Sequence, residues 1–426
     1  MTLRFSVELA PADAGWQGFI DIPMQGAVHV PLSEVVSTPT ELSFVLEVPG
    51  GKPAVFAAVR DGDRAAGVLQ QMGQEYPLIM YVGDEVRDEG PSRPQTPVPP
   101  FPYLEAEVSY THSDVTIGGT LVKPSEGGPF PAALLITGSG AQDRDETIFA
   151  HKPFAVIADH LVRQGIAVLR VDDRGVGRTT GNLANARSED LVADVLAGVS
   201  FLQSSKDIDP ERVGVIGHSE GGILGPGAAA VNPEIAFVVM LAGTGVSGRD
   251  ILMLQGQAMY EASGAEGEDL QALLALHAAA LDATDETREQ AIGDLVKAQL
   301  ASQGQSVDGE MFDQIAQGAA ASFASPWFQS FVVLDPRVAL RKVKCPVLAL
   351  SGSLDFQVPP DVNLPEIERA LEGNGDVTIR EFDGLNHLFQ PAKTGMLDEY
   401  GSIETTFAPE VLEVMTDWIR ARVDRE

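Results

Sequence analysis

The sequence predicts an α/β fold with a mostly parallel central sheet, an inserted helical cap and a small N-terminal antiparallel β domain. Three observations lead to this prediction. The chain has 426 residues, about two to three times the usual length of one domain, so a second folding unit is expected. Short apolar runs between turn residues fill residues 1–85, whereas from residue 105 longer apolar runs alternate with helix-like segments. Between residues 248 and 335 the apolar runs stop and helix-forming residues take their place.

The N-terminal β domain is expected over residues 1–85. Its β-branched and apolar runs are short and bounded by Gly, Pro and Asp, which is typical of antiparallel strands; they are Gly18–Ile22, Leu42–Val48 and Pro77–Tyr81. Residues 86–104 are rich in proline, which lacks an amide hydrogen and favours extended backbone. This segment is therefore expected to be a semi-rigid linker.

The larger domain is expected over residues 105–247 and 336–426. Its apolar runs are typical of buried parallel strands; they are Ala132–Ile136, Ile166–Val171, Val213–Ile216, Ala236–Leu241, Pro346–Leu350 and Val377–Phe382. Helix-like segments separate them, and Ser188 followed by two acidic residues is typical of a helix start. This alternation of strand and helix indicates a doubly wound sheet.

The cap is expected over residues 248–335. Segments such as Asp269–Leu281 and Thr287–Leu300 are rich in Ala, Leu, Gln and Glu, which favour helix and indicate several helices without strands. After the cap the sheet resumes, and the chain closes on a helix with Pro409 near its start.

The charge balance excludes several classes of partner. The chain has 29 Lys and Arg against 61 Asp and Glu, a net charge of −32, so nucleic acids and anionic lipid surfaces would be repelled. The acidic residues are dispersed, which is typical of a solvated surface. The longest apolar candidate, Ile223–Leu241, is interrupted by prolines and polar residues, so no membrane insertion is expected. The first six residues lack the apolar core of a secretion signal, but a chain whose signal had been removed would look the same, so the compartment stays open.

The segment that carries most chemical information is a glycine-flanked serine. The apolar run Val213–Ile216 leads directly into Gly217-x-Ser219-x-Gly221, and a probable helix follows. A strand, this pattern and a helix together are typical of a nucleophile elbow, in which side chains at the glycine positions would collide with neighbouring backbone. Ser219 is therefore the predicted nucleophile.

A serine hydroxyl needs a base to take its proton and an acid to orient that base. In folds with such an elbow the chain order is serine, acid, histidine, and only His277 and His387 follow Ser219. His277 lies within the expected cap, whereas His387 follows the last expected strand. His387 is therefore the predicted base.

The acid is expected at the carboxyl end of a strand, where open α/β sheets place their sites. Asp355 follows the run Val347–Leu350 closely and is the predicted acid. Asp361 and Asp383 are the alternatives, each of which also fits the role of an ordinary turn or loop acid.

Acyl transfer also requires hydrogen-bond donors for the developing oxyanion. Glu220, directly after the nucleophile, is expected to supply one backbone amide. The turn Thr137–Gly140 follows an early strand and should supply the second, with the amide of Ser139 favoured and Gly138 or Gly140 as alternatives. The charged segments Asp143–Glu146 and Asp172–Gly175 are expected to form a local ion-pair frame. No metal-binding or nucleotide-binding fingerprint accompanies them, and no cofactor is expected.

These motifs together resemble the α/β-hydrolase superfamily, and within it a bacterial group of esterases and serine hydrolases related to the serine aminopeptidase branch. The resemblance covers most of the chain; its motifs are Pro99–Tyr103, Thr137–Glu146, Asp172–Gly177, Gly217–Gly221, Ser325–Phe328 and Gly384–Gln390. It implies that the larger domain is catalytic, with Ser219 as nucleophile, Asp355 as acid, His387 as base and residues Gly138 to Gly140 in the oxyanion hole. Many relatives have His where this chain has Thr137, which should alter the geometry of the hole rather than abolish it.

The expected function is that of a serine carboxylesterase acting on a small-molecule ester through an acyl-enzyme. An aminopeptidase, a thioesterase and a lactonase of the same fold stay open, as does a binding role for the β domain, in which Trp16 is the one aromatic anchor that stands out. Trp327, Phe328 and Met253 in the cap are expected to line the substrate pocket. An apolar cap surface or a β edge could also pair two subunits into a homodimer.

Overall fold

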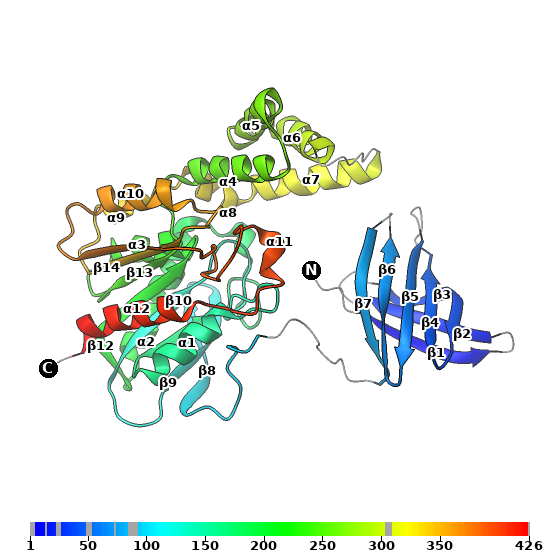
Figure 1. Ribbon diagram of the computed structural model, residues 1–426. Helices are drawn as coiled ribbons and strands as arrows, with labels where there is room; N and C mark the ends of the chain where they lie inside the picture. The colour runs from blue at the N-terminus through cyan, green and yellow to red at the C-terminus, as the bar shows by residue number, and fades with distance from the viewer. Residues whose placement is uncertain are drawn as a thin grey trace. The chain divides into compact units, whose positions relative to one another are not determined.

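The computed structural model divides the chain into two compact units, Met1–Gly90 and Pro91–Glu426 (Figure 1). The residues it describes are 5–12, 15–22, 27–47, 53–71, 74–83, 93–302 and 309–424. No helix in these ranges combines the length and the apolar character needed to cross a bilayer.

The first unit contains an antiparallel sheet of seven strands that pair in chain order. The strands are β1 (Ser6–Ala12), β2 (Gly15–Ile22), β3 (Ala27–Ser37), β4 (Glu41–Leu46), β5 (Ala54–Asp61), β6 (Arg64–Gln71) and β7 (Gln74–Tyr81). In β5 buried and exposed side chains alternate, as expected for a strand with one covered face. Phe44 of β4 and Phe56 of β5 pair in register and stack with ring centroids 4.5 Å apart in the core of this unit. Trp16 at the start of β2 is 39% exposed.

The second unit contains a sheet of eight strands in the order β15-β14-β13-β12-β10-β11-β9-β8. The strands are β8 (Tyr103–His112), β9 (Val115–Pro124), β10 (Phe130–Ile136), β11 (Ala167–Val171), β12 (Ile208–His218), β13 (Val238–Leu241), β14 (Val347–Gly352) and β15 (Val377–Phe382). The six strands from β10 onward run parallel, and β8 and β9 add an antiparallel edge. The fold is that of an α/β hydrolase, with its central strands β10, β12 and β13 buried.

Helices cover both faces of this sheet. Neighbouring residues of β10 point to opposite sides, so Leu135 packs with α1 (Pro153–Arg163) and α12 (Pro409–Val423), whereas Leu134 packs with the helices on the other face. Those helices are α2 (Ser188–Ser204), α3 (Gly221–Ala229), α9 (Pro336–Leu340) and α10 (Pro360–Ala370). Two short helices, η2 (Leu183–Asn185) and α11 (Leu397–Tyr400), lie in loops.

Between β13 and α9 the described residues form five helices: α4 (Gly248–Ala262), α5 (Gly267–Leu281), α6 (Arg288–Ser302), α7 (Glu310–Ala324) and α8 (Pro326–Val333). Figure 1 shows α4 to α7 gathered beyond one end of the sheet, away from its strands. They enclose a small core of their own around Tyr260, Leu273 and Ile292. α8 connects this layer to the sheet domain, because the hydroxyl groups of Ser330 and Ser188 are 3.1 Å apart.

Candidate active site

Ser219 lies in a tight turn between a central strand and a helix. β12 ends at His218 and α3 begins at Gly221, and Ser219 between them has a positive φ of 54°. This backbone conformation is strained for a residue with a side chain and persists only where the surroundings hold it. The Ser219 amide donates a hydrogen bond of 2.9 Å to the carbonyl oxygen of Leu241, the last residue of β13.

The two glycines of this turn leave no room for side chains. A Cβ at Gly217 would lie 1.9 Å from the carbonyl oxygen of Gly221, and a Cβ at Gly221 would lie 2.2 Å from that of Ile136. Because both neighbours are backbone atoms, rotation of a side chain cannot relieve either contact. The turn therefore packs closely against the end of β10. It also lies close to Gly138, where an added Cβ would be 3.2 Å from the Cβ of Ser219.

Asp355 and His387 form a buried pair. The Nδ1 atom of His387 lies 2.8 Å from Oδ2 of Asp355, and the two residues are 4% and 3% exposed. The other oxygen of Asp355 accepts hydrogen bonds from the amides of Gln357 and Val358, at 3.0 and 2.8 Å. With the carboxylate held in this way, Nδ1 carries the hydrogen and Nε2 of His387 is left with its lone pair, as a general base requires.

The loop that carries His387 is fastened to the residue before the serine. Nε2 of His218 donates to the carbonyl oxygen of His387 at 3.0 Å, and the two imidazole rings lie with centroids 4.7 Å apart. Among the described residues, no hydrogen bond joins the Ser219 hydroxyl to His387. In enzymes without substrate this contact is often loose and tightens when substrate binds.

The alternative acids and base lie elsewhere. Asp361 is in the first turn of α10, and Asp383 accepts a hydrogen bond of 3.3 Å from the hydroxyl of Ser353. His277 is in α5, where its Nδ1 lies 2.9 Å from the hydroxyl of Tyr260. Of the predicted residues, the structure therefore brings together Asp355, His387 and the turn that carries Ser219.

One of the predicted oxyanion donors needs correction. The amide of Gly138 donates to Oε1 of Glu146 at 2.7 Å, so it is already engaged and does not serve an oxyanion. The amides of Ser139 and Glu220 have no hydrogen-bond acceptor among the described residues, so both are free to donate, as the prediction requires.

The side chain of Glu220 faces the interior rather than solvent. It is 4% exposed and accepts a hydrogen bond of 3.1 Å from the indole nitrogen of Trp327 on α8. Burial raises the pKa of Glu220 to about 7, the hydrogen bond from Trp327 opposes the rise, and the charge of Asp173 adds to it. Burial likewise raises the pKa of Asp173 to about 7, although the Gln142 amide and the Thr137 hydroxyl donate to it.

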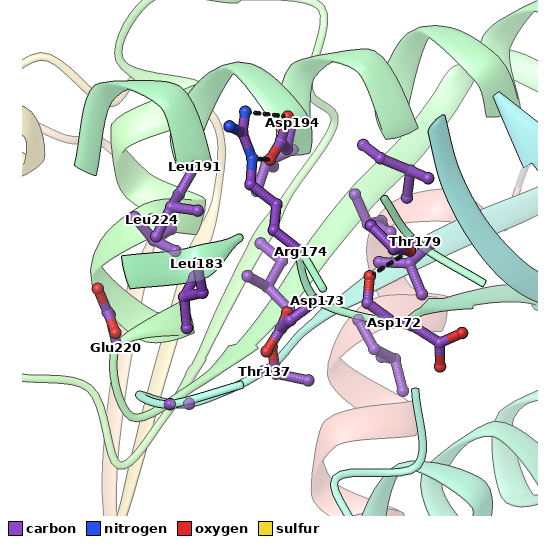
Figure 2. A pocket seen from close by; sticks show the side chains of 18 of the residues that line it. Thr137, Asp172, Asp173, Arg174, Thr179, Leu183, Leu191, Asp194, Glu220 and Leu224 are labelled. Atoms are coloured by element: carbon purple, nitrogen blue, oxygen red, sulfur yellow. Dashed lines mark hydrogen bonds and ion pairs between the residues drawn. The ribbon is translucent and has the colours of Figure 1, made fainter. Parts of the chain in front are cut away.

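Glu220 and Asp173 line one small cavity of about 60 Å³. In Figure 2 three leucines, Leu183, Leu191 and Leu224, lie near Glu220, and Asp173 lies beside Thr137. Arg174 of the same wall is paired with Asp194, with Nε and Oδ2 2.6 Å apart. Both carboxyl groups thus face a small, largely apolar space, which is consistent with their raised pKa values.

The residues predicted to line the substrate pocket lie outside this cavity: none of Trp327, Phe328 and Met253 lines it. Phe328 is 8% exposed and packs with Leu281 and Val332 inside the cap, and Met253 packs against the same cluster. Trp327 is the one of the three that reaches the site, through its hydrogen bond to Glu220.

The predicted ion-pair frame is present beside the site. Arg144 contacts both oxygens of Asp172, at 3.0 and 2.6 Å, and Arg170 pairs with Asp145. Burial alone would raise the pKa of Asp172, but the hydrogen bonds and charge of Arg144 outweigh it and lower the pKa. Glu146, from the same charged segment, instead bonds to Gly138 and His218, which the sequence prediction missed. The available signals were an acidic residue in the charged segment that follows the predicted turn and a histidine, His218, within the predicted elbow.

The chain is similar to known hydrolases. Residues 114–379 match the family described as X-Pro dipeptidyl-peptidase (S15 family). The chain is 30% identical over 292 residues to Esterase EstD of Thermotoga maritima, covering 67% of this chain and 61% of that protein. It is 28% identical over 137 residues to the putative hydrolase YtaP of Bacillus subtilis, covering 28% of this chain and 46% of that protein. The matches thus span less than two thirds of either relative.

Solved structures with a similar chain path include the Pyrococcus furiosus esterase Pf2001, with 15% identity, a TM-score of 0.48, and coverage of 78% of this chain and 98% of that one. Est1E of Butyrivibrio proteoclasticus, solved with ferulic acid bound, is 15% identical with a TM-score of 0.45 and covers 75% of this chain and 100% of that one.

Proposed function

The chain belongs to the X-Pro dipeptidyl-peptidase (S15) family of α/β hydrolases, and from this premise we propose that it is a serine carboxylesterase. The observation that carries the proposal is the buried Asp355–His387 pair beside the strained turn of Ser219. The similarity to an esterase over 67% of the chain supports the choice of an ester as substrate.

In the proposed reaction Ser219 Oγ attacks the ester carbonyl while His387 Nε2 takes its proton. Asp355 stabilises the resulting imidazolium, and the amides of Ser139 and Glu220 donate to the oxyanion of the tetrahedral intermediate. The carbon–oxygen bond to the alcohol then breaks, and His387 returns the proton to the leaving alkoxide. Water, deprotonated by the same imidazole, hydrolyses the acyl-enzyme and frees the acid and Ser219.

A peptidase that releases residues from an amino terminus is the second candidate, because the matched family is described by that activity. The same three side chains would cleave an amide, with the amine as leaving group. Thioesters and lactones present the same carbonyl chemistry and belong in the substrate panel.

The test is hydrolysis of activated esters graded by acyl length, compared with matched aminoacyl and Xaa-Pro arylamides, thioesters and lactones. Ester turnover should exceed amide turnover, and Ser219→Ala should lower it by roughly 10⁴-fold or more. Ser125→Ala, at an exposed serine, is the matched control and should leave the rate unchanged. Selective cleavage of the arylamides would favour the peptidase, and full ester activity in Ser219→Ala would overturn the role of Ser219.

A further inference from the structure

Glu146 and His218 form a second buried carboxylate–imidazole pair that the proposed reaction does not use. Oε1 of Glu146 lies 2.9 Å from Nδ1 of His218, and the two residues are 4% and 6% exposed. The pair sits next to the predicted base, since the rings of His218 and His387 have centroids 4.7 Å apart.

The hydrogen bonds of His218 point to its protonation state beside an ionised Glu146. Its Nε2 faces the carbonyl oxygen of His387, which can only accept, so Nε2 carries a hydrogen. Its Nδ1 faces Oε1 of Glu146, the same oxygen that accepts the amide hydrogen of Gly138. An ionised carboxylate satisfies both contacts at that oxygen only if Nδ1 also carries a hydrogen. Both ring nitrogens are then protonated, and His218 is an imidazolium.

The charges around His218 favour this state. Burial alone would lower the pKa of His218, but the charge and hydrogen bond of Glu146 outweigh it, so the pKa lies above its ordinary value. The carbonyl of His387 and the charge of Asp355 act in the same direction. The other residues lining the small pocket between Glu146 and His218 are apolar: Pro153, Phe154, Ile157, Leu241, Leu388 and Phe407.

We propose that Glu146 and the imidazolium of His218 form an ion pair that positions three parts of the active site at once. Glu146 holds the oxyanion turn through the Gly138 amide. His218 is the residue before Ser219 in the chain, and its ring holds the loop of His387 through the carbonyl of that residue. Both are positioning residues, because neither would touch the substrate. The effect on turnover rests on the proposed function, whereas the charge state does not.

Glu146→Gln tests the coupling. The amide is nearly isosteric but uncharged, so one oxygen can no longer hold an imidazolium and accept from Gly138 as well. A neutral His218 could keep both of its own bonds only if the new glutamine turned its amide nitrogen toward Nδ1, and the bond from the Gly138 amide would then be lost. We expect kcat to fall by about 10- to 100-fold with KM changed by less than about threefold, because misplacement by about 1 Å costs on the order of 10²-fold in rate.

The pH profile separates this role from a purely structural one. In the wild-type protein the ion pair is intact below the raised pKa of His218, so the part of kcat that depends on it should decline as pH rises through that pKa. In Glu146→Gln the decline should move to lower pH. Glu126→Gln, at an exposed glutamate, is the control and should match the wild type. Wild-type kcat and an unshifted profile in a folded Glu146→Gln protein would overturn the proposal.

Ring nitrogen NMR of the wild-type protein provides a test that needs neither activity nor a folded variant. Of the 7 histidines, His218 should keep both ring nitrogens protonated as the pH rises past the ordinary pKa of histidine. The signals of His218 are identified as those that disappear in His218→Gln. If that variant does not fold, the nuclear Overhauser effect between ring protons of His218 and His387 identifies them instead. A neutral His218 overturns the ion pair. A protonated His218 in a protein without hydrolytic activity would instead contradict the proposed function alone.

Discussion

Replacing Glu220 by Gln should change how the stability of the second unit depends on pH. The Glu220 carboxyl is 4% exposed, and its partner in the structure is the neutral indole N–H of Trp327. Gln keeps an oxygen for that N–H and has nearly the same shape, so the packing around Leu224 and α8 should survive. What the substitution removes is the ionisation of a buried acid.

The size of the effect follows from the pKa of Glu220, which burial raises from 4.5 to about 7. A carboxyl whose pKa is higher in the folded state contributes stability that is fully present below about pH 4.5. This contribution is lost as the pH rises through about 7, because the unfolded chain ionises first. At about 1.4 kcal/mol per pKa unit, the loss is on the order of 3 kcal/mol. The Gln variant has no such loss, so its stability relative to the wild type should improve by that amount between pH 4.5 and pH 8.5.

Urea unfolding at several pH values measures this difference. A Trp16→Phe background leaves Trp327 and Trp418 as the fluorescent probes, and both belong to the second unit, so its transition is followed separately from that of the β sheet. Glu234→Gln, at an exposed glutamate, is the matched control and should track the wild type at every pH. Parallel pH curves for Glu220→Gln and the wild type would refute the reasoning that Glu220 is a buried, protonated acid.

Two further predictions concern the elbow and the predicted acid. Gly221→Ala should destabilise the second unit by about 3 kcal/mol or more, the upper end of the usual cost of overpacking. The reason is that the new Cβ would lie 2.2 Å from the carbonyl oxygen of Ile136. Gly293→Ala, in α6 with nothing within 4 Å of the new Cβ, should instead stabilise by about 0.5–1 kcal/mol; equal urea midpoints for the two variants would contradict this. Asp355→Asn should lower kcat by about 10⁴-fold with an unchanged urea midpoint, because Asn would present N–H to Nδ1 of His387 and favour the wrong tautomer; a loss below tenfold would exclude Asp355 as the acid.

The parts of the fold that could be predicted are those with a strong local signal. Mostly apolar runs marked the buried strands β10, β11, β13 and β14 and the second half of β12, because a strand covered on both faces has no polar face to alternate with. The antiparallel edge formed by β8 and β9 was not predicted. The strand β8 has the sequence YLEAEVSYTH, which mixes polar and apolar residues. It begins at Tyr103, where a linker was expected. In the first unit an antiparallel β domain was expected from three apolar runs, and the described residues form a sheet of seven strands.

The site was predictable where chain order limits the choice and not where a contact depends on the path of a loop. Only two histidines follow Ser219 in the chain. His277 lies in a segment predicted to be entirely helical, so His387 could be selected from the sequence. The engagement of the Gly138 amide could not, because the acceptor, Glu146, reaches it through an irregular loop. The packing of Phe328 with Leu281 and Val332 could not be predicted either, because the sequence of a helix such as α8 shows an apolar face without showing which residues cover that face.

The central claim is that Ser219 is the nucleophile served by His387, and covalent labelling tests it most directly. One equivalent of a fluorophosphonate reagent should modify the wild-type chain once, and peptide mass spectrometry should place the adduct on Ser219. The rate of labelling should fall in Asp355→Asn, and no adduct should form in Ser219→Ala. An adduct on another residue, or undiminished labelling of Ser219→Ala, would contradict the account.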